Sequence, residues 1–383
     1  MKRLPTVLAF LAAAAGAARA QDQVKIDRAI KRGIEYLKTA GSPGHEHSGA
    51  THSDELILLT FIHAEVPESD PKFKALLQRV LTDEPAQTYK VALQAMALEE
   101  LDRVKYQARI AQCAQFLVDN QCQNGQWTYG KPTTYSKDLP STDLKADVAS
   151  GRAPKPAGVL DFSKTGPREK PRVVRRISIK KQKDGPASGD NSNTQYAALG
   201  LRACYDAGIM FEESVIALAV KWLLESQHPP EDGAGANAVA SGGDARPRGW
   251  NYRTPGDDKD PYGSMTAGAV GCLTIYDYML KKDWKRNPAV NSGMAWLAKH
   301  FSVTDNPGRG GTWYYYYLYG LERAGILYDT QKIGSHDWYA QGAKVLLEKQ
   351  GDNGAWNKEW DTCFAILFLK KATRPLVATE GKR

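Results

Sequence analysis

The stretch from Gly311 to Ala372 decides the fold. It reads GTWYYYYLYGLERAGILY, followed by a short turn, then HDWYAQGAKVLLEKQGDNGAW and, from Asp361, DTCFAILFLKKA. The spacing of its apolar residues predicts an apolar and aromatic helix, then an amphipathic helix, then a second apolar helix. The same pattern, which predicts one amphipathic and one apolar helix, recurs five times upstream. The chain is therefore predicted to be built from repeats.

The amphipathic helix ends in a motif with the spacing Q-x-x-x-G-x-W. A glycine at this place can adopt the left-handed conformation that ends a helix, and the Trp and Gln can fold back over the exposed last turn. We interpret the motif as a structural staple of the repeat. It occurs at Gln350, Gly354 and Trp356, again at Gln121, Gly125 and Trp127, and in a degraded form, with an inserted loop, at Gln227, Gly249 and Trp250.

Twelve helices are expected, in six pairs of an outer amphipathic and an inner apolar helix. Inner helices that are apolar nearly all round are typical of helices buried on every side. Six such pairs close most economically as one ring within another, so the fold class is all-α, an (α/α)6 toroid forming a single domain over residues 21–383. The expected pairs are Val24–Thr39 with Ser53–Ala64, Pro71–Leu81 with Thr88–Leu101, Tyr106–Asn120 with Asn193–Ala207, Glu212–Ser226 with Tyr262–Lys281, Pro288–His300 with Thr312–Ile326, and Trp338–Lys349 with Asp361–Lys371.

The first twenty residues read as a secretory signal peptide. Lys2 and Arg3 precede an apolar run too short to span a membrane, and Ala18-Arg19-Ala20 is typical of a cleavage site. We therefore expect export to the periplasm or the medium after cleavage near Ala20. Cleavage there removes Lys2, Arg3 and Arg19 and lowers the formal charge from +8 to +5.

The five cysteines include no C-x-x-C pair, which excludes a zinc ribbon. Cys113 and Cys122 would lie on opposite sides of one helix and could not form a disulfide bond while that helix is intact. Three further cysteines fall in apolar helical stretches. We expect all five to be buried free thiols.

Two inserts interrupt the repeats. The first, residues 131–190, is rich in Pro and carries 14 basic and 7 acidic residues, with a basic stretch at 164–183. Such a stretch can bind an anionic polymer or a membrane surface; alternatively it is a solvated excursion with a short hairpin around VVRRISI. No specific nucleic-acid motif is present. The second insert, residues 231–260, is rich in Gly and Asp and is expected to be a loop at one mouth of the ring.

These features together resemble the prenyltransferase and squalene oxidase repeat family. The resemblance rests on the Q-x-x-x-G-x-W endings, the six helix pairs and the phrases WYYYYLYGLERAG, DWYAQGAKVLLEKQ and DTCFAILFLKKA. The family includes squalene-hopene cyclases and the β subunits of protein prenyltransferases, whose fold is the α/α toroid. The resemblance therefore implies that fold and the handling of an isoprenoid, while chemistry has to be sought residue by residue.

Squalene-hopene cyclases protonate an alkene with the middle Asp of a D-x-D-D motif, which this sequence lacks. Its nearest counterpart is Asp257-Asp258-Lys259-Asp260, in a loop before an inner helix. A lysine among the acids lowers their pKa values, which suits a base better than an alkene-protonating acid. These three aspartates are candidate catalytic residues, with a solvated loop as the alternative.

Protein prenyltransferases hold zinc with an Asp-x-Cys pair and a later His. Asp361 and Cys363 supply the pair, but no His follows. Closing the ring would bring His52, before the first inner helix, beside them. A candidate site for catalytic zinc is thus formed by His52, Asp361 and Cys363. The alternative is that Cys363 is simply a small apolar residue packed in the core.

A ring of polar groups is expected where the N-termini of the six inner helices converge. Aligned helix N-termini attract anions, so an anionic head group, diphosphate or carboxylate, is the predicted ligand class. Alignment on Gly200 and Gly320 places Thr266 at the same level as Gln195 and Cys363. The candidate ligand-binding residues are Glu55, Asn193, Gln195, Thr266, Trp313 and Tyr315.

Three classes of function stay open. The first is an enzyme or carrier that handles an isoprenoid or another amphiphilic anionic ligand in an aromatic lumen. The second is a non-catalytic binding or scaffold protein. The third is a carbohydrate-active enzyme, which needs two carboxylates about 5 to 9.5 Å apart, and Asp54 or Glu55 with Asp361 is the candidate pair.

Overall fold

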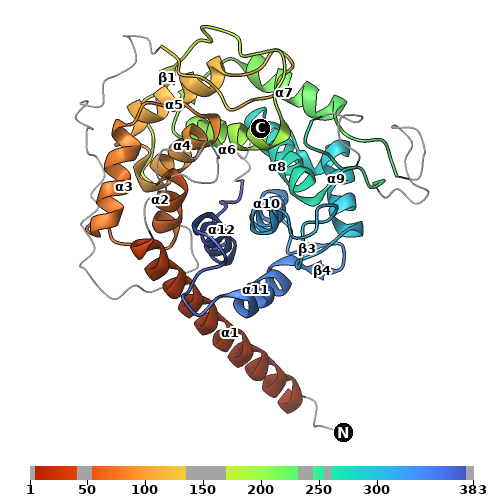
Figure 1. Cartoon of the computed structure of the whole chain (residues 1–383). Coiled ribbons are helices and arrows are strands. Elements are labelled where there is room, and N and C mark those ends of the chain that lie inside the picture. Colours follow the sequence, from red (N-terminus) through yellow and green to blue (C-terminus); the bar gives the residue numbers. More distant parts are fainter. Residues whose placement is uncertain (1–4, 41–53, 135–169, 232–244, 254–259, 377–383) are drawn as a thin grey trace.

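The computed structural model describes residues 5–40, 54–134, 170–231, 245–253 and 260–376, and in this part the chain is all-α with four very short strands (Figure 1). Apart from the first helix, every predicted helix is present and begins and ends within two residues of its expected position. The outer helices are α1 (Pro5–Thr39), α3 (Pro71–Thr82), α5 (Gln107–Asp119), α7 (Glu213–Glu225), α9 (Pro288–Lys299) and α11 (Trp338–Lys349). The inner helices are α2 (Asp54–His63), α4 (Thr88–Asp102), α6 (Asn191–Asp206), α8 (Gly263–Met279), α10 (Tyr314–Tyr328) and α12 (Glu359–Leu369).

The inner helices form a closed circuit of contacts. Each packs against the next in the order α2, α4, α6, α8, α10, α12, and α12 packs against α2. Figure 1 shows the outer helices arranged around this circuit. The first outer helix closes the outer layer, because α1 contacts both α11 and α12.

The first helix differs from its prediction at its start. We expected an outer helix from Val24, whereas α1 is continuous from Pro5. Its first half projects away from the ring in Figure 1. The part that packs against the ring begins near Ile26, which is 5% exposed.

Caps at the outer helices fix where several of them begin. Asp70 accepts hydrogen bonds from the backbone N–H groups of Lys72 (2.9 Å) and Phe73 (3.2 Å), and Pro71 stands at the first turn of α3. Asn287 and Pro288 repeat this arrangement at α9. An oxygen acceptor followed by proline is the expected start of a helix, because it satisfies donors that have no intrahelical partner.

The three Trp residues of the Q-x-x-x-G-x-W motif are fully buried and fold back onto their own outer helix, as predicted. Each indole N–H donates to a carbonyl in the last turns of that helix: Trp127 to Leu117 (2.7 Å), Trp250 to Leu223 (2.8 Å) and Trp356 to Leu346 (2.8 Å). Each Trp backbone N–H donates to a threonine at the start of the paired inner helix: Thr194, Thr266 and Thr362, at 3.0 to 3.1 Å. The motif is confirmed as a staple between the two helices of a pair, including its degraded copy.

The Gln residues of the motif do more than the sequence predicted, because they connect one pair to the next. Their amide nitrogens donate to carbonyls of the following outer helix: Gln121 to Val215 of α7 (2.7 Å), Gln227 to Ala289 of α9 (3.1 Å) and Gln350 to Ala29 of α1 (2.8 Å). The last of these joins the end of the chain to its beginning. The motif therefore also closes the outer layer.

The prediction of a hairpin around VVRRISI (residues 173–179) is wrong. β1 (Ile177–Ser178) pairs in parallel with β2 (Ile209–Met210), which follows α6, while the antiparallel pair in the structure is β3 (Lys332–Ile333) with β4 (His336–Asp337). Ile177 and Ile179 are buried. Residues 170–183 are thus held against α5 and α6 rather than forming a solvated excursion.

All five cysteines are buried and free, as predicted. Among the described residues, no helix is both long and apolar enough to cross a membrane.

Candidate functional site

The N-terminal ends of inner helices lie beside one another at one end of the ring. Asn191, the first residue of α6, donates its backbone N–H to the carbonyl of Tyr252, which precedes α8 (2.8 Å). Gly263, the first residue of α8, donates in the same way to Pro307, which precedes α10 (2.8 Å). This is the end of the ring where the sequence predicted a ligand site.

Several of these helix starts already have acceptors from the chain itself. The side chain of Asp190 accepts a hydrogen bond from the backbone N–H of Asn193 (2.8 Å). The side-chain carbonyl of Asn306 accepts one from the backbone N–H of Ser264 (2.9 Å). The carbonyl of Tyr129 accepts from Thr88 at the start of α4 (2.7 Å). At three inner helices, backbone donors that an anionic ligand would use are therefore already occupied.

Buried carboxyl groups lie at the same end. Glu55 in the first turn of α2 and Asp361 in the first turn of α12 are each 8% exposed. Burial raises the pKa of Glu55 to about 7 and raises that of Asp361, whose carboxylate accepts from the Asn357 amide at 2.6 Å. Burial thus favours the neutral form of both groups, in which a carboxyl group can donate a hydrogen bond.

The candidate acids of the second insert are only partly described. Asp257 and Asp258 lie outside the described residues, and Asp260 is exposed. An exposed carboxylate is hydrated, whereas an acid that protonates an alkene has to lie in an enclosed, apolar site. The catalytic role proposed for this loop stays a prediction.

The candidate zinc site is also described only in part, because His52 lies outside the described residues. Cys363 is fully buried, and burial raises the pKa of its thiol to about 12. Within the described ranges, no group of three His, Cys, Asp or Glu side chains is placed to hold a metal ion. Zinc binds the thiolate form of cysteine, so the surroundings of Cys363 oppose metal binding.

The expected register of the inner helices was wrong by one residue. Thr266 carries the same hydrogen bond to a motif Trp as Thr194 and Thr362, so it matches these residues rather than Gln195 and Cys363. One residue turns a helix by about 100°. Thr266 consequently faces its outer helix, while Gln195 is directed inward to Tyr316 and Arg323.

Two aromatic candidates lie at the start of α10. Trp313 is 53% exposed and has a left-handed backbone with φ of 56°, an unusual conformation for a bulky side chain. Tyr315 is half-buried; burial, followed by the nearby Asp361 charge, raises the pKa of its hydroxyl to about 12. These two side chains provide aromatic surface at this end of the ring.

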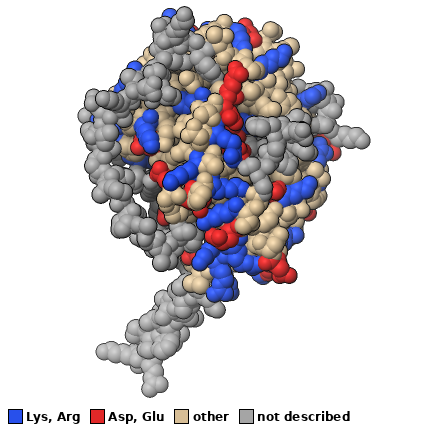
Figure 2. Space-filling view, turned by 60° about the vertical axis from the view of Figure 1, so that its left-hand side comes forward, with Lys and Arg blue, Asp and Glu red and all other residues tan. Residues whose placement is uncertain are grey.

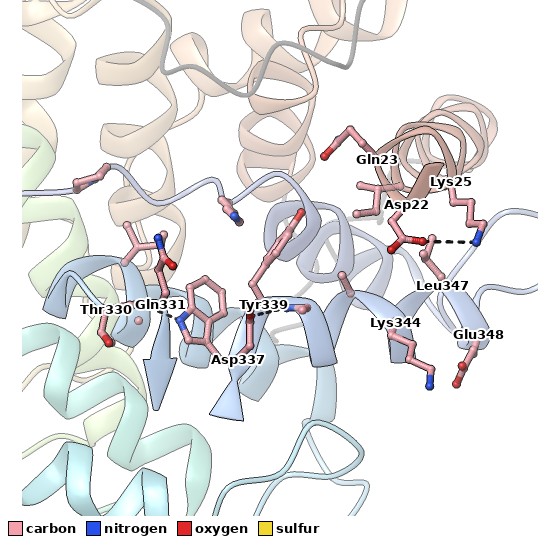
Figure 3. A pocket seen from close by; sticks show the side chains of 18 of the residues that line it. Asp22, Gln23, Lys25, Thr330, Gln331, Asp337, Tyr339, Lys344, Leu347 and Glu348 are labelled. Carbon is pink, nitrogen blue, oxygen red and sulfur yellow. Dashed lines mark hydrogen bonds and ion pairs between the residues drawn. The ribbon is translucent and has the colours of Figure 1, made fainter. Parts of the chain in front are cut away.

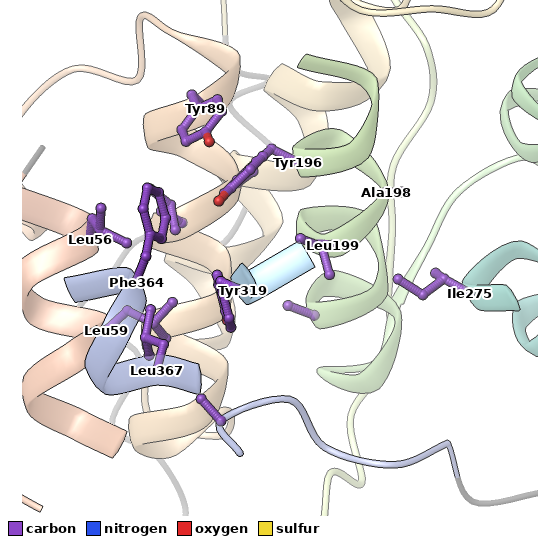
Figure 4. Packing of buried hydrophobic residues seen from close by; sticks show 14 of the residues in the cluster. Leu56, Leu59, Tyr89, Tyr196, Ala198, Leu199, Ile275, Tyr319, Phe364 and Leu367 are labelled. Atoms are coloured by element: carbon purple, nitrogen blue, oxygen red, sulfur yellow. The ribbon is translucent and has the colours of Figure 1, made fainter. Parts of the chain in front are cut away.

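The centre of the ring is filled with aromatic side chains (Figure 4). Tyr89 of α4 and Tyr196 of α6 stack with ring centres 3.6 Å apart. Tyr316 and Tyr319 of α10 complete the packing against Phe364 of α12, with ring centres 5.7 and 6.0 Å from it. All five side chains are at most 6% exposed.

A cation lies among these rings. Arg323 of α10 is 3% exposed, and its guanidinium carbon lies 4.3 Å from the ring centre of Tyr319 and 5.4 Å from that of Tyr196. One amino group of the guanidinium, Nη2, donates to Gln195 at 3.0 Å. Sequence reasoning missed this residue; the available signal was a charged pair, Glu322 and Arg323, inside a mainly aromatic and apolar helix.

The opposite end of the ring is closed by charged groups and by the segment after α12. Arg374 forms a two-point ion pair with Glu100 of α4, and Lys170 pairs with both Glu99 and Glu100. Thr373 donates to Glu322 of α10 through its backbone N–H (3.0 Å) and its hydroxyl (2.6 Å). Only about 60 Å³ of space remains between these groups.

A groove of about 1170 Å³ lies on the outside of the ring, between α1 and α11 (Figure 3). Its apolar lining includes Ile26, Trp338, Tyr339 and Leu347. Charged side chains of both signs stand around it: Asp22, Lys25, Asp329, Asp337, Lys344, Glu348 and Lys371.

A basic strip runs along residues 172–183, and its backbone is fixed. The carbonyls of Arg175 and Lys180 accept hydrogen bonds from Gln107 (2.7 Å) and Gln115 (2.8 Å) of α5. Lys181 pairs with Asp184, whereas no described carboxylate pairs with the other five basic side chains. These five are exposed: Arg172, Arg175, Arg176, Lys180 and Lys183.

Figure 2 shows one face of the molecule, on which Lys and Arg are mixed with Asp and Glu.

Searches of protein-family models, of curated proteins and of solved structures find no match for this chain.

Proposed function

We propose that the protein is an exported, non-catalytic binding protein of the (α/α)6 toroid class, related to the prenyltransferase and squalene oxidase repeat proteins. In this proposal the ring is a rigid scaffold, and the partners that it binds as its function contact its outer surface. The closed circuit of inner helices and the three copies of the Q-x-x-x-G-x-W staple support the toroid. The basic leader ending at Ala20 supports export.

The filled centre is the observation that carries this proposal. An isoprenoid cyclase needs an open aromatic lumen in which rings stabilise a carbocation. Here the aromatic rings already surround the guanidinium of Arg323. A permanent positive charge about 4 to 5 Å away would repel a carbocation strongly in a medium of low dielectric constant. The centre therefore suits a structural role better than cyclisation.

The basic strip suggests the partner: an anionic polymer. Five exposed cations lie within twelve residues on a backbone held by α5 and β2. Because the backbone is already fixed, binding requires ordering of side chains only, which lowers its entropic cost. Regularly repeated charge on the partner would match the repeated charge of the strip.

The test measures binding of a sulfated polysaccharide to the mature protein at several salt concentrations. The variant changes three strip residues together, Arg175→Gln, Arg176→Gln and Lys180→Gln. The matched control removes the same charge from exposed lysines of three outer-layer segments, Lys74→Gln, Lys221→Gln and Lys282→Gln.

We expect the strip variant to lose at least tenfold in affinity and most of the salt dependence, and the control to lose less than about twofold. Equal losses in the two variants would show that only net charge matters and would refute the strip. Binding to anionic vesicles but not to the polymer would replace the polymer by a membrane surface.

The outer groove favours a second candidate, which is binding of an amphiphilic ligand such as an isoprenoid between α1 and α11. Its volume of about 1170 Å³ suits such a ligand, and Trp338 and Tyr339 provide aromatic surface. Native mass spectrometry of the protein purified from its exported compartment tests this. A bound lipid that is lost in Ala343→Trp, which fills the groove, supports the candidate; a protein free of lipid in every preparation excludes it.

A further inference from the structure

The buried Arg323 lacks a counter-charge among the described residues. Its neighbour Glu322 turns away and accepts both of its hydrogen bonds from Thr373, and burial raises the pKa of this glutamate to about 7. Among the described residues, the guanidinium donates to the neutral amide of Gln195 and lies beside the neutral hydroxyl of Tyr196. A cation removed from water without a partner is costly, by several kcal/mol even after relaxation. Contacts with the faces of two tyrosine rings offset only part of such a cost.

Three buried polar atoms around this cation make no well-formed hydrogen bond, although they lie close to one another. They are Nη1 of Arg323 and the hydroxyls of Tyr89 and Tyr196. The two tyrosine rings are stacked, so their hydroxyls lie close together, and Figure 4 shows both turned toward the space between α6 and α12. Buried polar groups are almost always paired in native proteins. A buried cation without a counter-charge, next to hydroxyls that make no well-formed hydrogen bond, calls for a ligand that accepts hydrogen bonds and is negatively charged.

We propose that Arg323, Tyr89 and Tyr196 form an internal binding site for one small monovalent anion, a halide or a small carboxylate. Gln195 and Tyr316 hold the guanidinium side of the site in place. The Gln195 amide bonds both the guanidinium and the Tyr316 hydroxyl, and Tyr316 in turn bonds Ser192 (3.0 Å). The anion neutralises the centre of the ring and is enclosed by it, so it acts as a structural ligand. This inference is independent of the partner proposed for the basic strip.

Size distinguishes this site from general salt effects. Chloride and bromide are small enough to be enclosed, whereas gluconate carries the same charge and is excluded by its size. Thermal and urea unfolding are therefore compared in sodium chloride and in sodium gluconate at equal ionic strength. Above the dissociation constant, each tenfold increase in chloride is expected to raise the folding equilibrium constant about tenfold. Gluconate is expected to give no such increase.

Two substitutions assign the effect to the site. Tyr89→Phe removes one hydroxyl with little change in shape. We expect it to raise the dissociation constant for chloride, obtained from the dependence of stability on chloride concentration, at least tenfold. The matched control is Tyr276→Phe. Tyr276 of α8 is fully buried and its hydroxyl also makes no well-formed hydrogen bond, but among the described residues no arginine contributes to its surroundings. This variant should keep the wild-type chloride dependence.

Arg323→Met provides the stronger test, because it removes the charge and keeps an apolar side chain of similar length. Its unfolding is expected to be the same in chloride and gluconate. Crystals grown in sodium bromide give the direct observation, which is one anomalous bromide peak within hydrogen-bond distance of Arg323 Nη1. Water alone at that position, or equal stability in chloride and gluconate for the wild-type protein, would overturn the proposal. Either result stands even if Arg323→Met fails to fold.

Discussion

The contact between α1 and the end of α11, which closes the outer layer, offers the sharpest test of the fold. Gly354 has a φ of +86°, and a Cβ atom added there would lie 2.6 Å from the backbone oxygen of Arg32 in α1. Neither helix can yield easily, because Gln350 ties α11 to Ala29 of α1 at 2.8 Å. Gly354→Ala must therefore strain its own backbone and push α1 away from α11.

The two costs can be separated by a control. A left-handed alanine costs about 1 to 2 kcal/mol, and forcing an atom into a packed contact costs about 1 to 3 kcal/mol more. Gly310 also has a positive φ, of +58°, but a Cβ there meets nothing within 4 Å. We expect Gly354→Ala to lose about 2 to 5 kcal/mol in the free energy of unfolding, and Gly310→Ala only about 1 to 2 kcal/mol.

Urea unfolding measures both losses, and amide hydrogen exchange shows where the structure opens. Exchange in α1 should accelerate in Gly354→Ala and remain unchanged in Gly310→Ala. Equal losses for the two variants, with no change in α1, would refute the claim that this contact closes the layer.

Three further predictions address single residues. Burial raises the pKa of Glu322 to about 7 from its ordinary value of 4.5, so its stabilising contribution is complete below pH 4.5 and is lost as the pH rises through 7. Unfolding of the wild type and of Glu322→Gln across this range should reveal a difference in stability that changes by about 3 kcal/mol, whereas parallel curves would contradict the shift. Cys363→Ala should leave the zinc content of the purified protein unchanged, because the thiol is buried with a pKa of about 12, and metal analysis that finds zinc only in the wild type would restore the predicted site. Trp250→Phe should cost about 1 to 3 kcal/mol in urea unfolding, since it removes the bond to Leu223 and leaves a void; a loss below about 0.5 kcal/mol would mean that the degraded motif is no longer a staple.

Local patterns predicted most of the fold. Apolar periodicity placed the helices after the first within two residues, because the inner helices are buried nearly all round, and outer helices such as α3, α7 and α11 are buried on one face. The copies of Q-x-x-x-G-x-W predicted the staple, since Trp127 and Trp356 contact residues ten positions earlier in their own helices.

Contacts between distant parts of the chain were not predictable in this way. The hairpin around VVRRISI was a local guess, whereas β1 in fact pairs with a strand about thirty residues later. The register error at Thr266 arose because glycines were aligned rather than the threonines that bond the motif Trp residues. Gln350 reaches α1 across the whole length of the chain. Such partners depend on how the ring closes.

The anion site could have been approached from sequence through helical spacing alone. Tyr316, Tyr319 and Arg323 stand at positions i, i+3 and i+7, which places them on one face of α10. Tyr314 and Tyr317 share a different face, and their hydroxyls bond the carbonyls of Val303 and Ser302 outside the centre. The run of four tyrosines thus divides between two environments. Because the inward face ends in a cation, the same helix that fills the centre with aromatic surface also gives that centre a positive charge, and the chain leaves this charge for a ligand to balance.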